Sequence, residues 1–208
     1  MERRILAVSS VVFLAFSILL ISIFRVAAPQ HTFLAFTSQV LPASESDMRI
    51  NYELPYPGKI LPDHPLWFIK ALRDRLWILA TTSNSKKAEL YLLFSDKRLE
   101  SARILFEKGK ADLAFSTLTK AEKYLELAQK KEESNRQKGL DTKNFLSKLA
   151  NASLKHRQVI NNILEIAPED ARPEIIKIEE YSRNVYEKSR DALNSFGMPV
   201  PANPFNGD

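Results

Sequence analysis

Few residues in this sequence could do chemistry, and none stands in a recognised catalytic spacing. The chain has three histidines, His31, His64 and His156, and no cysteine. His31 and His64 lie in proline-containing stretches, whereas His156 falls on a row of apolar residues at helical spacing, where a hydrogen-bonded core histidine is expected. The absence of cysteine from the sequence excludes disulfides and thiolate metal sites.

Known motifs for metal, nucleotide and phosphate binding do not occur either. The sequence contains no Glu-x-x-His, which a di-iron helical bundle requires, and no His-Glu-x-x-His. Its five glycines form neither a dinucleotide-binding nor a phosphate-binding loop. The adjacent acids Glu132–Glu133 and Glu179–Glu180 would point to different sides of a helix. We therefore expect no catalytic residue, no cofactor, no metal site and no enzymatic activity.

The charge of the chain does not indicate a nucleic-acid partner. Lysine and arginine number 30 and aspartate and glutamate 25, for a formal net charge of +5. Basic residues alternate with acidic ones, as in Asp96-Lys97-Arg98, a pattern that is typical of solvated helix faces. Nucleic-acid binding needs basic residues clustered on one face, so we expect no nucleic-acid partner.

An uncharged, proline-free segment, Ile5–Phe24, has the length of a membrane span. At about 1.5 Å per residue a helix of this length crosses roughly 30 Å of hydrocarbon. The alternative is a cleaved signal peptide, which would make the protein secreted. Signal peptides have shorter apolar regions, and Pro29 directly follows the nearest small pair, Ala27-Ala28. The segment therefore predicts an uncleaved anchor and a membrane contact.

Positive charge near this segment sets the expected topology. Arg3 and Arg4 precede it, whereas only Arg25 follows it before Arg49. This bias favours an N-terminus inside the cell and the bulk of the chain outside the cytoplasm. The expected order is a cytoplasmic tail (1–4), the anchor (5–24), a tether (25–54), an extracytoplasmic helical bundle (55–197) and a disordered tail (198–208). Four cytoplasmic residues are too few to hold a protein partner.

Apolar residues recur at helical spacing in five segments after residue 65. The first is short (66–80), with Ile69, Leu72, Leu76 and Leu79 in one row. Four longer helices are expected at about 85–108, 110–137, 141–166 and 168–196. Gly109, Gly139 and Gly197 are the expected helix stops. The rows of the longer helices are Ala88, Leu92, Ser95, Leu99, Ala102 and Phe106; Ala114, Leu118, Ala121, Leu125 and Ala128; Phe145, Leu149, Ala152, His156, Val159, Ile163 and Ile166; and Ile175, Ile178, Val185, Ala192 and Phe196.

These patterns predict an all-α fold: a single N-terminal transmembrane helix followed by an antiparallel helical bundle of one short and four longer helices. Short links make consecutive helices antiparallel, and alternating spacings of four and three residues favour left-handed, coiled-coil-like packing at about 20°. Small residues, including Ala102 and Ala114, predict the closest packing between the first two long helices. Beyond Ala128 the third segment is polar, which predicts a protruding or frayed helix end.

Residues 55–65 contain four prolines and form a stiff extended strap rather than a helix or a central strand. From this strap onward the chain resembles a bacterial domain of unknown function that is appended to signal-anchored, extracytoplasmic proteins. The resemblance covers about residues 52–129 and implies no activity, ligand or catalytic residue. It rests on separated blocks that occur in order: Leu54-Pro-Tyr-Pro-Gly-Lys-Ile-Leu-Pro-Asp-His-Pro-Leu-Trp67, Lys70-Ala-Leu-Arg-Asp-Arg75, Lys86-Lys-Ala-Glu, Ser95-Asp-Lys-Arg-Leu99 and Lys108-Gly-Lys110.

Charged residues within these blocks are the candidate interaction or structural network. We expect ion pairs between the short helix and the first long helix, and we expect Trp67 to lie in the core, held there by the strap. The candidate residues are Trp67, Arg73, Asp74, Arg75, Asp96, Lys97 and Arg98.

Two functions remain open. The favoured one is an anchored module that binds a protein or envelope partner of unknown identity. The alternative is a small-ligand or lipid-binding sensor with a pocket under the strap. An exposed apolar patch over a solid core favours the first function, and a cavity with converging polar groups favours the second. The sequence does not define the oligomeric state.

Overall fold

The computed structural model describes residues 50–205, which form five helices and no strand. The predicted anchor at 5–24 lies outside the described residues. No helix within the described part combines the length and the apolar character needed to cross a bilayer. The helices are α2 (Trp67–Ala80), α3 (Asn84–Glu107), α4 (Ala111–Gln137), α5 (Lys143–Ile166) and α6 (Arg172–Ser195). Each begins and ends within a few residues of its predicted bounds.

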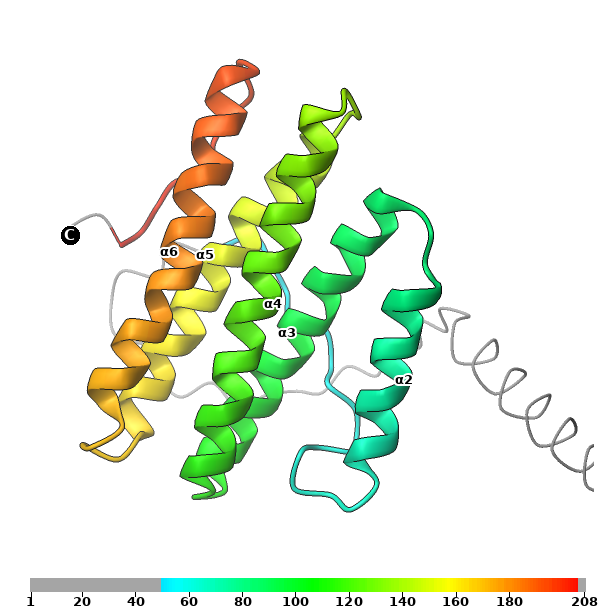
Figure 1. The fold of residues 1–208 in the computed structure, drawn as a ribbon. Coiled ribbons are helices and arrows are strands. Elements are labelled where there is room, and N and C mark those ends of the chain that lie inside the picture. Colours follow the sequence, from blue (N-terminus) through cyan, green and yellow to red (C-terminus); the bar gives the residue numbers. More distant parts are fainter. Residues whose placement is uncertain (1–49, 206–208) are drawn as a thin grey trace, which may run out of the picture. The chain divides into compact units, whose positions relative to one another are not determined.

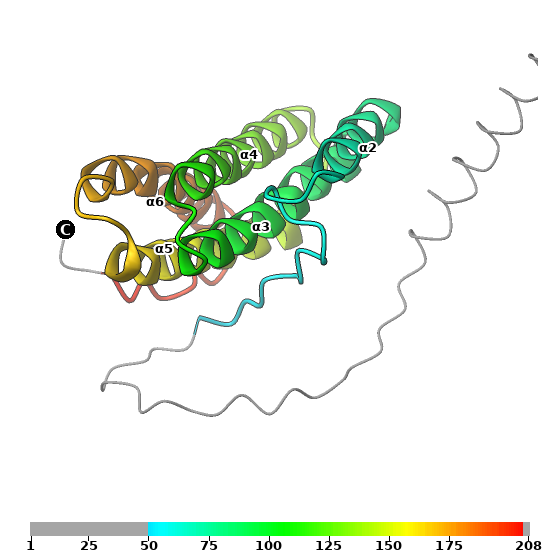
Figure 2. The same cartoon turned by 90° about the horizontal axis from the view of Figure 1, so that it is seen from below.

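Helices α3 to α6 form a four-helix bundle in which consecutive helices are antiparallel (Figure 1). Seen along its axis, α3 lies beside α4 and α5, and α6 lies beside α4 and α5 (Figure 2). The contact between α3 and α4 is the most extensive, as predicted from their small residues. Ala102, Ala114 and Ala121 are completely buried there, because short side chains let the two backbones approach closely.

The turn between α3 and α4 depends on Gly109, which has a φ of +69°. The Gly109 N–H donates to the carbonyl of Phe106 at 2.9 Å, and the Lys110 N–H donates to that of Leu105 at 2.9 Å. This pair of bonds is a Schellman motif, which satisfies carbonyls that the end of a helix leaves free. The positive φ explains why the predicted helix stop is a glycine.

Most of the predicted apolar rows form the core. Leu99, Leu118, Leu125, Leu149 and Ile163 are fully buried, and the principal cluster joins all four long helices. Two predicted core positions are wrong: Ile166 and Phe196, at the last residue of α5 and just after α6, are 49% and 41% exposed. At a helix end the neighbouring helix no longer covers the row.

The prediction that the C-terminal part of α4 protrudes or frays is wrong. Gln129, Glu132 and Asn135 in this part are all at most 3% exposed. The Thr142 hydroxyl donates to the Glu132 carboxylate at 2.8 Å, and Arg136 pairs with the same carboxylate at 3.2 Å. Polar residues thus continue the buried face of α4 where apolar ones stop, and hydrogen bonds offset part of their desolvation.

Both predicted domain limits also need correction. Ile50 and Tyr52, assigned to the tether, pack against buried clusters of the bundle. Met198 and Phe205, assigned to a disordered tail, pack against the cluster that contains Tyr186. The Tyr186 hydroxyl donates to the Pro201 carbonyl at 2.8 Å. The packed region thus extends at least from Ile50 to Phe205 and is wider than the predicted 55–197.

Candidate functional site

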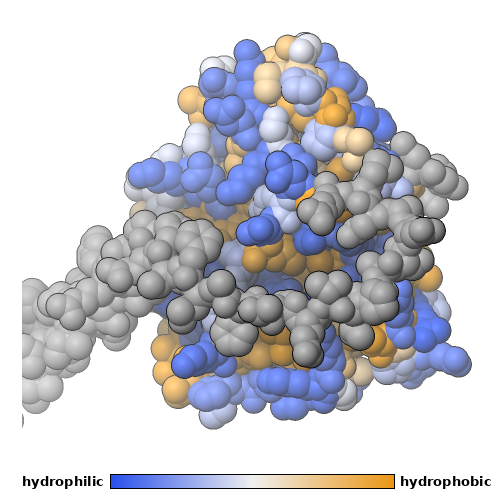
Figure 3. Space-filling view, turned by 180° about the vertical axis from the view of Figure 1, so that it is seen from behind, coloured by the Kyte–Doolittle hydropathy of each residue, from blue (hydrophilic) through white to orange (hydrophobic). Residues whose placement is uncertain are grey.

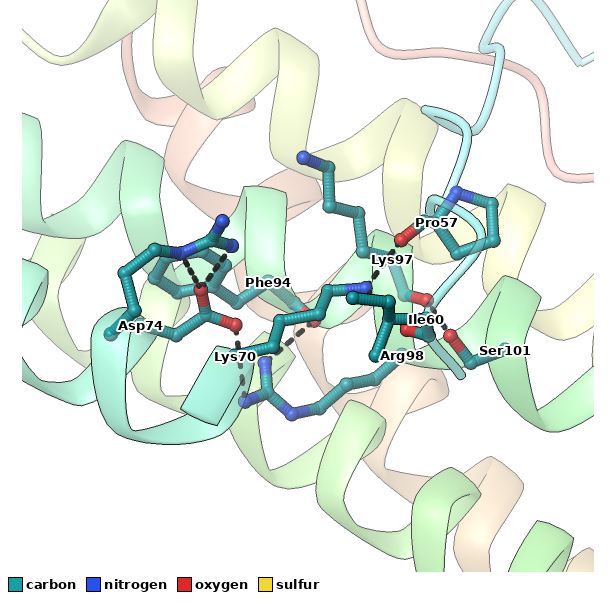
Figure 4. A network of polar contacts seen from close by, with 9 residues as sticks. Pro57, Ile60, Lys70, Asp74, Phe94, Lys97, Arg98 and Ser101 are labelled. Carbon is teal, nitrogen blue, oxygen red and sulfur yellow. Dashed lines mark hydrogen bonds and ion pairs between the residues drawn. The ribbon is translucent and has the colours of Figure 1, made fainter. Parts of the chain in front are cut away.

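The short helix α2 packs only against α3 among the described helices, and a buried ion pair joins the two. Asp74 is 3% exposed and accepts hydrogen bonds from Arg73, the closer at 2.8 Å. The Arg98 guanidinium of α3 lies 3.9 Å from the other Asp74 oxygen and donates to the Phe94 carbonyl at 3.1 Å (Figure 4). Removing one member of such a buried pair leaves the other uncompensated. The contact therefore specifies how α2 sits on α3.

Arg98 also contacts aromatic rings. Its guanidinium carbon lies 4.3 Å from the centroid of the Tyr124 ring and 5.7 Å from that of Phe94. These are distances at which a cation is attracted to a ring face. Burial lowers the pKa of Arg98, although nearby Tyr124 and Asp74 act in the opposite direction. Arg98 is thus a fixed structural cation between α2, α3 and α4 and not a free binding group.

The proline-rich strap is held by Lys70 of α2. Its ammonium donates to the carbonyls of Pro57 at 2.6 Å and Ile60 at 2.9 Å (Figure 4). Burial lowers the pKa of Lys70 to about 8, and Asp74 partly opposes this shift. Asp63, at the other end of the strap, pairs at 2.8 Å with Lys110, in the turn between α3 and α4. The strap is thus held by α2 through Lys70 and by this turn through Lys110.

The other predicted network residues lie apart from this pair. Trp67 is half-buried at the start of α2, outside the described core clusters, with the Lys70 ammonium 4.9 Å from its ring centroid. Arg75 is exposed. Lys97 is half-buried, and burial lowers its pKa. The expectation that Trp67 lies in the core is wrong, because α2 turns other residues towards α3.

Asp96, the remaining predicted residue, belongs to a second polar cluster inside the bundle. His156 of α5 is fully buried between two carboxylates. Its Nδ1 lies 2.6 Å from Glu122 of α4, and its Nε2 lies 3.1 Å from Asp96 of α3. The Tyr52 hydroxyl donates to the second Asp96 oxygen at 2.6 Å. This polar core cluster, Tyr52–Asp96–His156–Glu122, ties three helices and the segment before the strap to one point.

The two carboxylates keep His156 charged. Burial alone would lower its pKa, but Glu122 and Asp96 outweigh that effect and raise it to about 9. The pKa of the Tyr52 hydroxyl is raised by burial and by the Asp96 charge. Both ring nitrogens of His156 are engaged, and no group of three or more metal-binding side chains in residues 50–205 is arranged to hold an ion. The cluster therefore has the properties of a structural network.

Glu122 and Tyr52 were missed by the sequence analysis. A signal for Glu122 exists, because Leu118, Glu122 and Leu125 are spaced by four and three residues, as core positions are. Tyr52 gave no such signal, since it precedes all the described helices and is brought to Asp96 by the path of the strap.

A further feature of α2 is a row of exposed apolar residues. Its predicted apolar row faces outward and not towards the bundle, which corrects the expectation that it belongs to the core. The exposed fractions of the five residues on this outward face are 66% for Phe68, 52% for Ile69, 55% for Leu72, 49% for Leu76 and 74% for Leu79. Seen from behind, hydrophobic surface is visible in several places, among them the lower left, the side on which α2 lies (Figure 3).

The reverse side of α2 explains this orientation. Asp74 and Ile78 are its buried residues, and Trp77 meets Phe94 edge-on with ring centroids 6.1 Å apart. The helix thus has apolar residues on two faces. The face that can pair Asp74 with Arg98 packs on α3, and the richer apolar face remains in solvent.

Two surface cavities border the strap and the segment before it. One of about 450 Å³ is lined by Tyr52, Asp96, Lys148 and Asn151 among others. The Tyr52 hydroxyl and both Asp96 oxygens are already engaged within the polar core cluster. A second, of about 520 Å³, lies between Tyr56, Arg103 and Lys155.

Among the comparisons with known proteins, only the one with protein families gives a match. No curated protein and no solved structure matches the chain. A family described as Domain of unknown function (DUF5667) matches residues 59–170, more than half of the chain. This range runs from the strap through α2, α3, α4 and α5 and so includes the buried ion pair and most of the polar core cluster. The chain therefore belongs to the family of proteins with the domain of unknown function DUF5667.

Proposed function

We propose that this protein is a membrane-anchored interaction module that presents the outward face of α2 to a partner. The observation that carries the proposal is the row of five apolar side chains exposed on that face. Contiguous apolar patches on a domain surface mark interaction sites, whereas single exposed apolar residues are ordinary. The bundle α3–α6 has a complete core without this face, so folding gives no reason for its apolar character.

The anchor and its orientation are the second part of the proposal. The uncharged run at 5–24 and the excess of arginine before it support a single span with the bundle outside the cytoplasm. A reporter fused after Asp208 should be active only if it works outside the cytoplasm. Activity of a cytoplasm-dependent reporter at that position would contradict the orientation.

The proposal gives the domain no catalytic role. In the polar core cluster, both His156 nitrogens are occupied by carboxylates. The alternative function, a small-ligand or lipid sensor, would use a pocket under the strap, and the cavities beside Tyr52 and Tyr56 are the candidates. It has less support, because polar groups that line them are paired within the fold, Tyr52 with Asp96 and Arg103 with Glu100. Direct recognition of a ligand needs polar groups that converge on it.

A photoreactive amino acid in place of Leu72, introduced into the full chain in cells, tests the role of α2. Ile176 on α6 is the matched control, because the two residues are 55% and 54% exposed. Position 72 should give a defined covalent adduct, and position 176 should give much less. Equal or negligible adduct formation at both positions would refute an interaction role for α2.

A further inference from the structure

We propose that the outward face of α2 docks on the surface of an anionic lipid bilayer. The apolar row would lie at the boundary between headgroups and acyl chains, with neighbouring arginine at the level of the phosphates. This inference rests on the proposed interaction role of α2 and names the partner that its surface fits best.

The first argument is the pattern of α2 itself. Helices that lie in a membrane interface carry leucine, phenylalanine and tryptophan on one side and basic residues beside them. In α2 the five exposed apolar residues share one side, and Leu66, directly before the helix, adds a sixth at 48% exposure. Fourteen residues give a helix of roughly 21 Å, which allows this side to lie flat against a membrane.

The second argument is charge. Asp74 is the only acidic residue of α2, and it is buried and paired with Arg73 and Arg98. Arg75 is exposed on α2. Near the start of α3, Lys86 and Glu89 are both exposed and offset one another. The charge that α2 itself presents to solvent is therefore positive. Basic residues close to an anionic bilayer contribute about 1 kcal/mol each to attraction.

The shape and charge of α2 favour a bilayer over other occupants. A second copy of the chain would bring the positively charged margins of two α2 helices together without an acidic residue of α2 to pair them. A protein partner would need a groove shaped to a single projecting helix and lined with acidic residues. A bilayer deforms around a convex helix and needs no such shape, and long basic side chains reach the phosphates beside it.

The proposed anchor places a bilayer within reach. If residues 5–24 span the membrane, residues 25–49 connect the span to the first described residue. A chain of 25 residues can span at most roughly 80–90 Å, so the lipid surface is within its reach. Tethering makes docking intramolecular, so that a weak affinity of one helix for lipid suffices.

A tryptophan on the outward face provides a fluorescence probe for the test. Trp67 and Trp77 are both partly buried, and Trp77 packs on Phe94 on the reverse side. The probe is therefore Phe68→Trp, present in every chain compared, and the chain without it gives the background emission. The full chain is reconstituted into vesicles of phosphatidylcholine, with or without phosphatidylglycerol, in which the lipid acyl chains are brominated. Docking should quench tryptophan emission strongly in the anionic vesicles and less in the neutral ones.

One double variant of α2 and one single-site control on α6 make the result specific to α2. Leu72→Glu with Leu76→Glu should lower the docked population at least about tenfold, because two apolar side chains are replaced by anionic ones. Ile176→Glu, one such charge at a comparably exposed site, should leave the quenching unchanged. A thermal melt by circular dichroism confirms that each variant is folded.

The outcomes separate this inference from the proposed function. Quenching that depends on anionic lipid and on Leu72 and Leu76 supports bilayer docking. Emission unaffected by brominated lipid, or quenched equally in the Leu72→Glu/Leu76→Glu variant, overturns it. If the photoreactive residue at position 72 then yields a protein adduct, the interaction role stands and only the partner is wrong. If it yields no adduct above the level at position 176, both proposals fail.

Discussion

Replacing His156 by glutamine should remove a pH dependence that the polar core cluster gives to the stability of the fold. Glutamine can still form hydrogen bonds with Glu122 and Asp96, but it does not titrate. In the wild-type chain, the fully buried imidazole is held charged by the two carboxylates. The variant leaves those carboxylates without a cation, so it should also be less stable at neutral pH by about 3–5 kcal/mol.

The magnitude follows from the two pKa values. The pKa of His156 is 6.5 in an unperturbed environment and about 9 in the fold. Each pKa unit corresponds to about 1.4 kcal/mol, so the charged imidazole contributes about 3 kcal/mol. Because the folded pKa is the higher one, this contribution is complete below pH 6.5 and is lost as the pH rises through 9.

Urea unfolding of the wild-type chain and of His156→Gln, measured from pH 6 to pH 9.5, tests this reasoning. The difference in unfolding free energy should shrink by about 3 kcal/mol across this range. Lys70 acts in the opposite direction, since its folded pKa is lowered to about 8, but it is common to both chains and cancels in the difference.

A difference that stays constant with pH would refute the charged state of His156. If the variant does not fold, nuclear magnetic resonance provides a direct measurement on the wild-type chain. The sequence has only three histidines, so the signal of His156 can be assigned in a chain that lacks His31 and His64. A titration midpoint near or below 6.5 would contradict the account.

Three further predictions concern the strap, Trp67 and the domain limits. Lys70→Met should destabilise the fold by about 1–3 kcal/mol and speed hydrogen exchange across the strap, because two carbonyls lose their donor. Lys59→Met, at an exposed position, is the control, and equal effects of the two changes would contradict the role of Lys70. Trp67→Ala should lower the free energy of unfolding in urea by about 1–2 kcal/mol, as expected for a half-buried ring with a cation beside it. A decrease above about 3 kcal/mol would show that Trp67 belongs to the core after all. A fragment of residues 48–208 should melt cooperatively. A fragment of residues 52–197 should melt at a lower temperature, because it lacks Ile50 and Phe205. Equal melting temperatures by circular dichroism would contradict the packing of both ends.

The sequence predicted the bundle well because its core rows are long and regular. Along α4, for example, Ala114, Leu118, Ala121 and Leu125 are all fully buried, as their spacing indicates. It failed for α2, where both sides of the helix carry apolar residues. There the outcome depends on the pairing of Asp74 with Arg98, a contact between two helices that no local pattern encodes.

The polar core cluster was predictable only in part. The helical spacing placed His156 in the core, but its partners lie on α3, on α4 and before the strap. To identify these partners, one must know how each helix is rotated about its own axis. A row of apolar residues defines that rotation only coarsely. The same limit explains why the polar end of α4 was expected to protrude, although Glu132 and Asn135 are buried.

The central claim is that a partner covers the outward face of α2. Cysteine labelling in intact cells tests this claim most directly. The chain has no cysteine, so Leu72→Cys and Ile176→Cys each provide a single reactive thiol at matched exposure. With a membrane-impermeant maleimide, position 176 should label quickly and position 72 slowly in intact cells. Both should label at the same rate in a purified fragment of residues 48–208 that is free of membrane and detergent. Equal labelling of the two positions in intact cells would contradict a covered α2 face, and no labelling at position 176 would contradict an extracytoplasmic bundle.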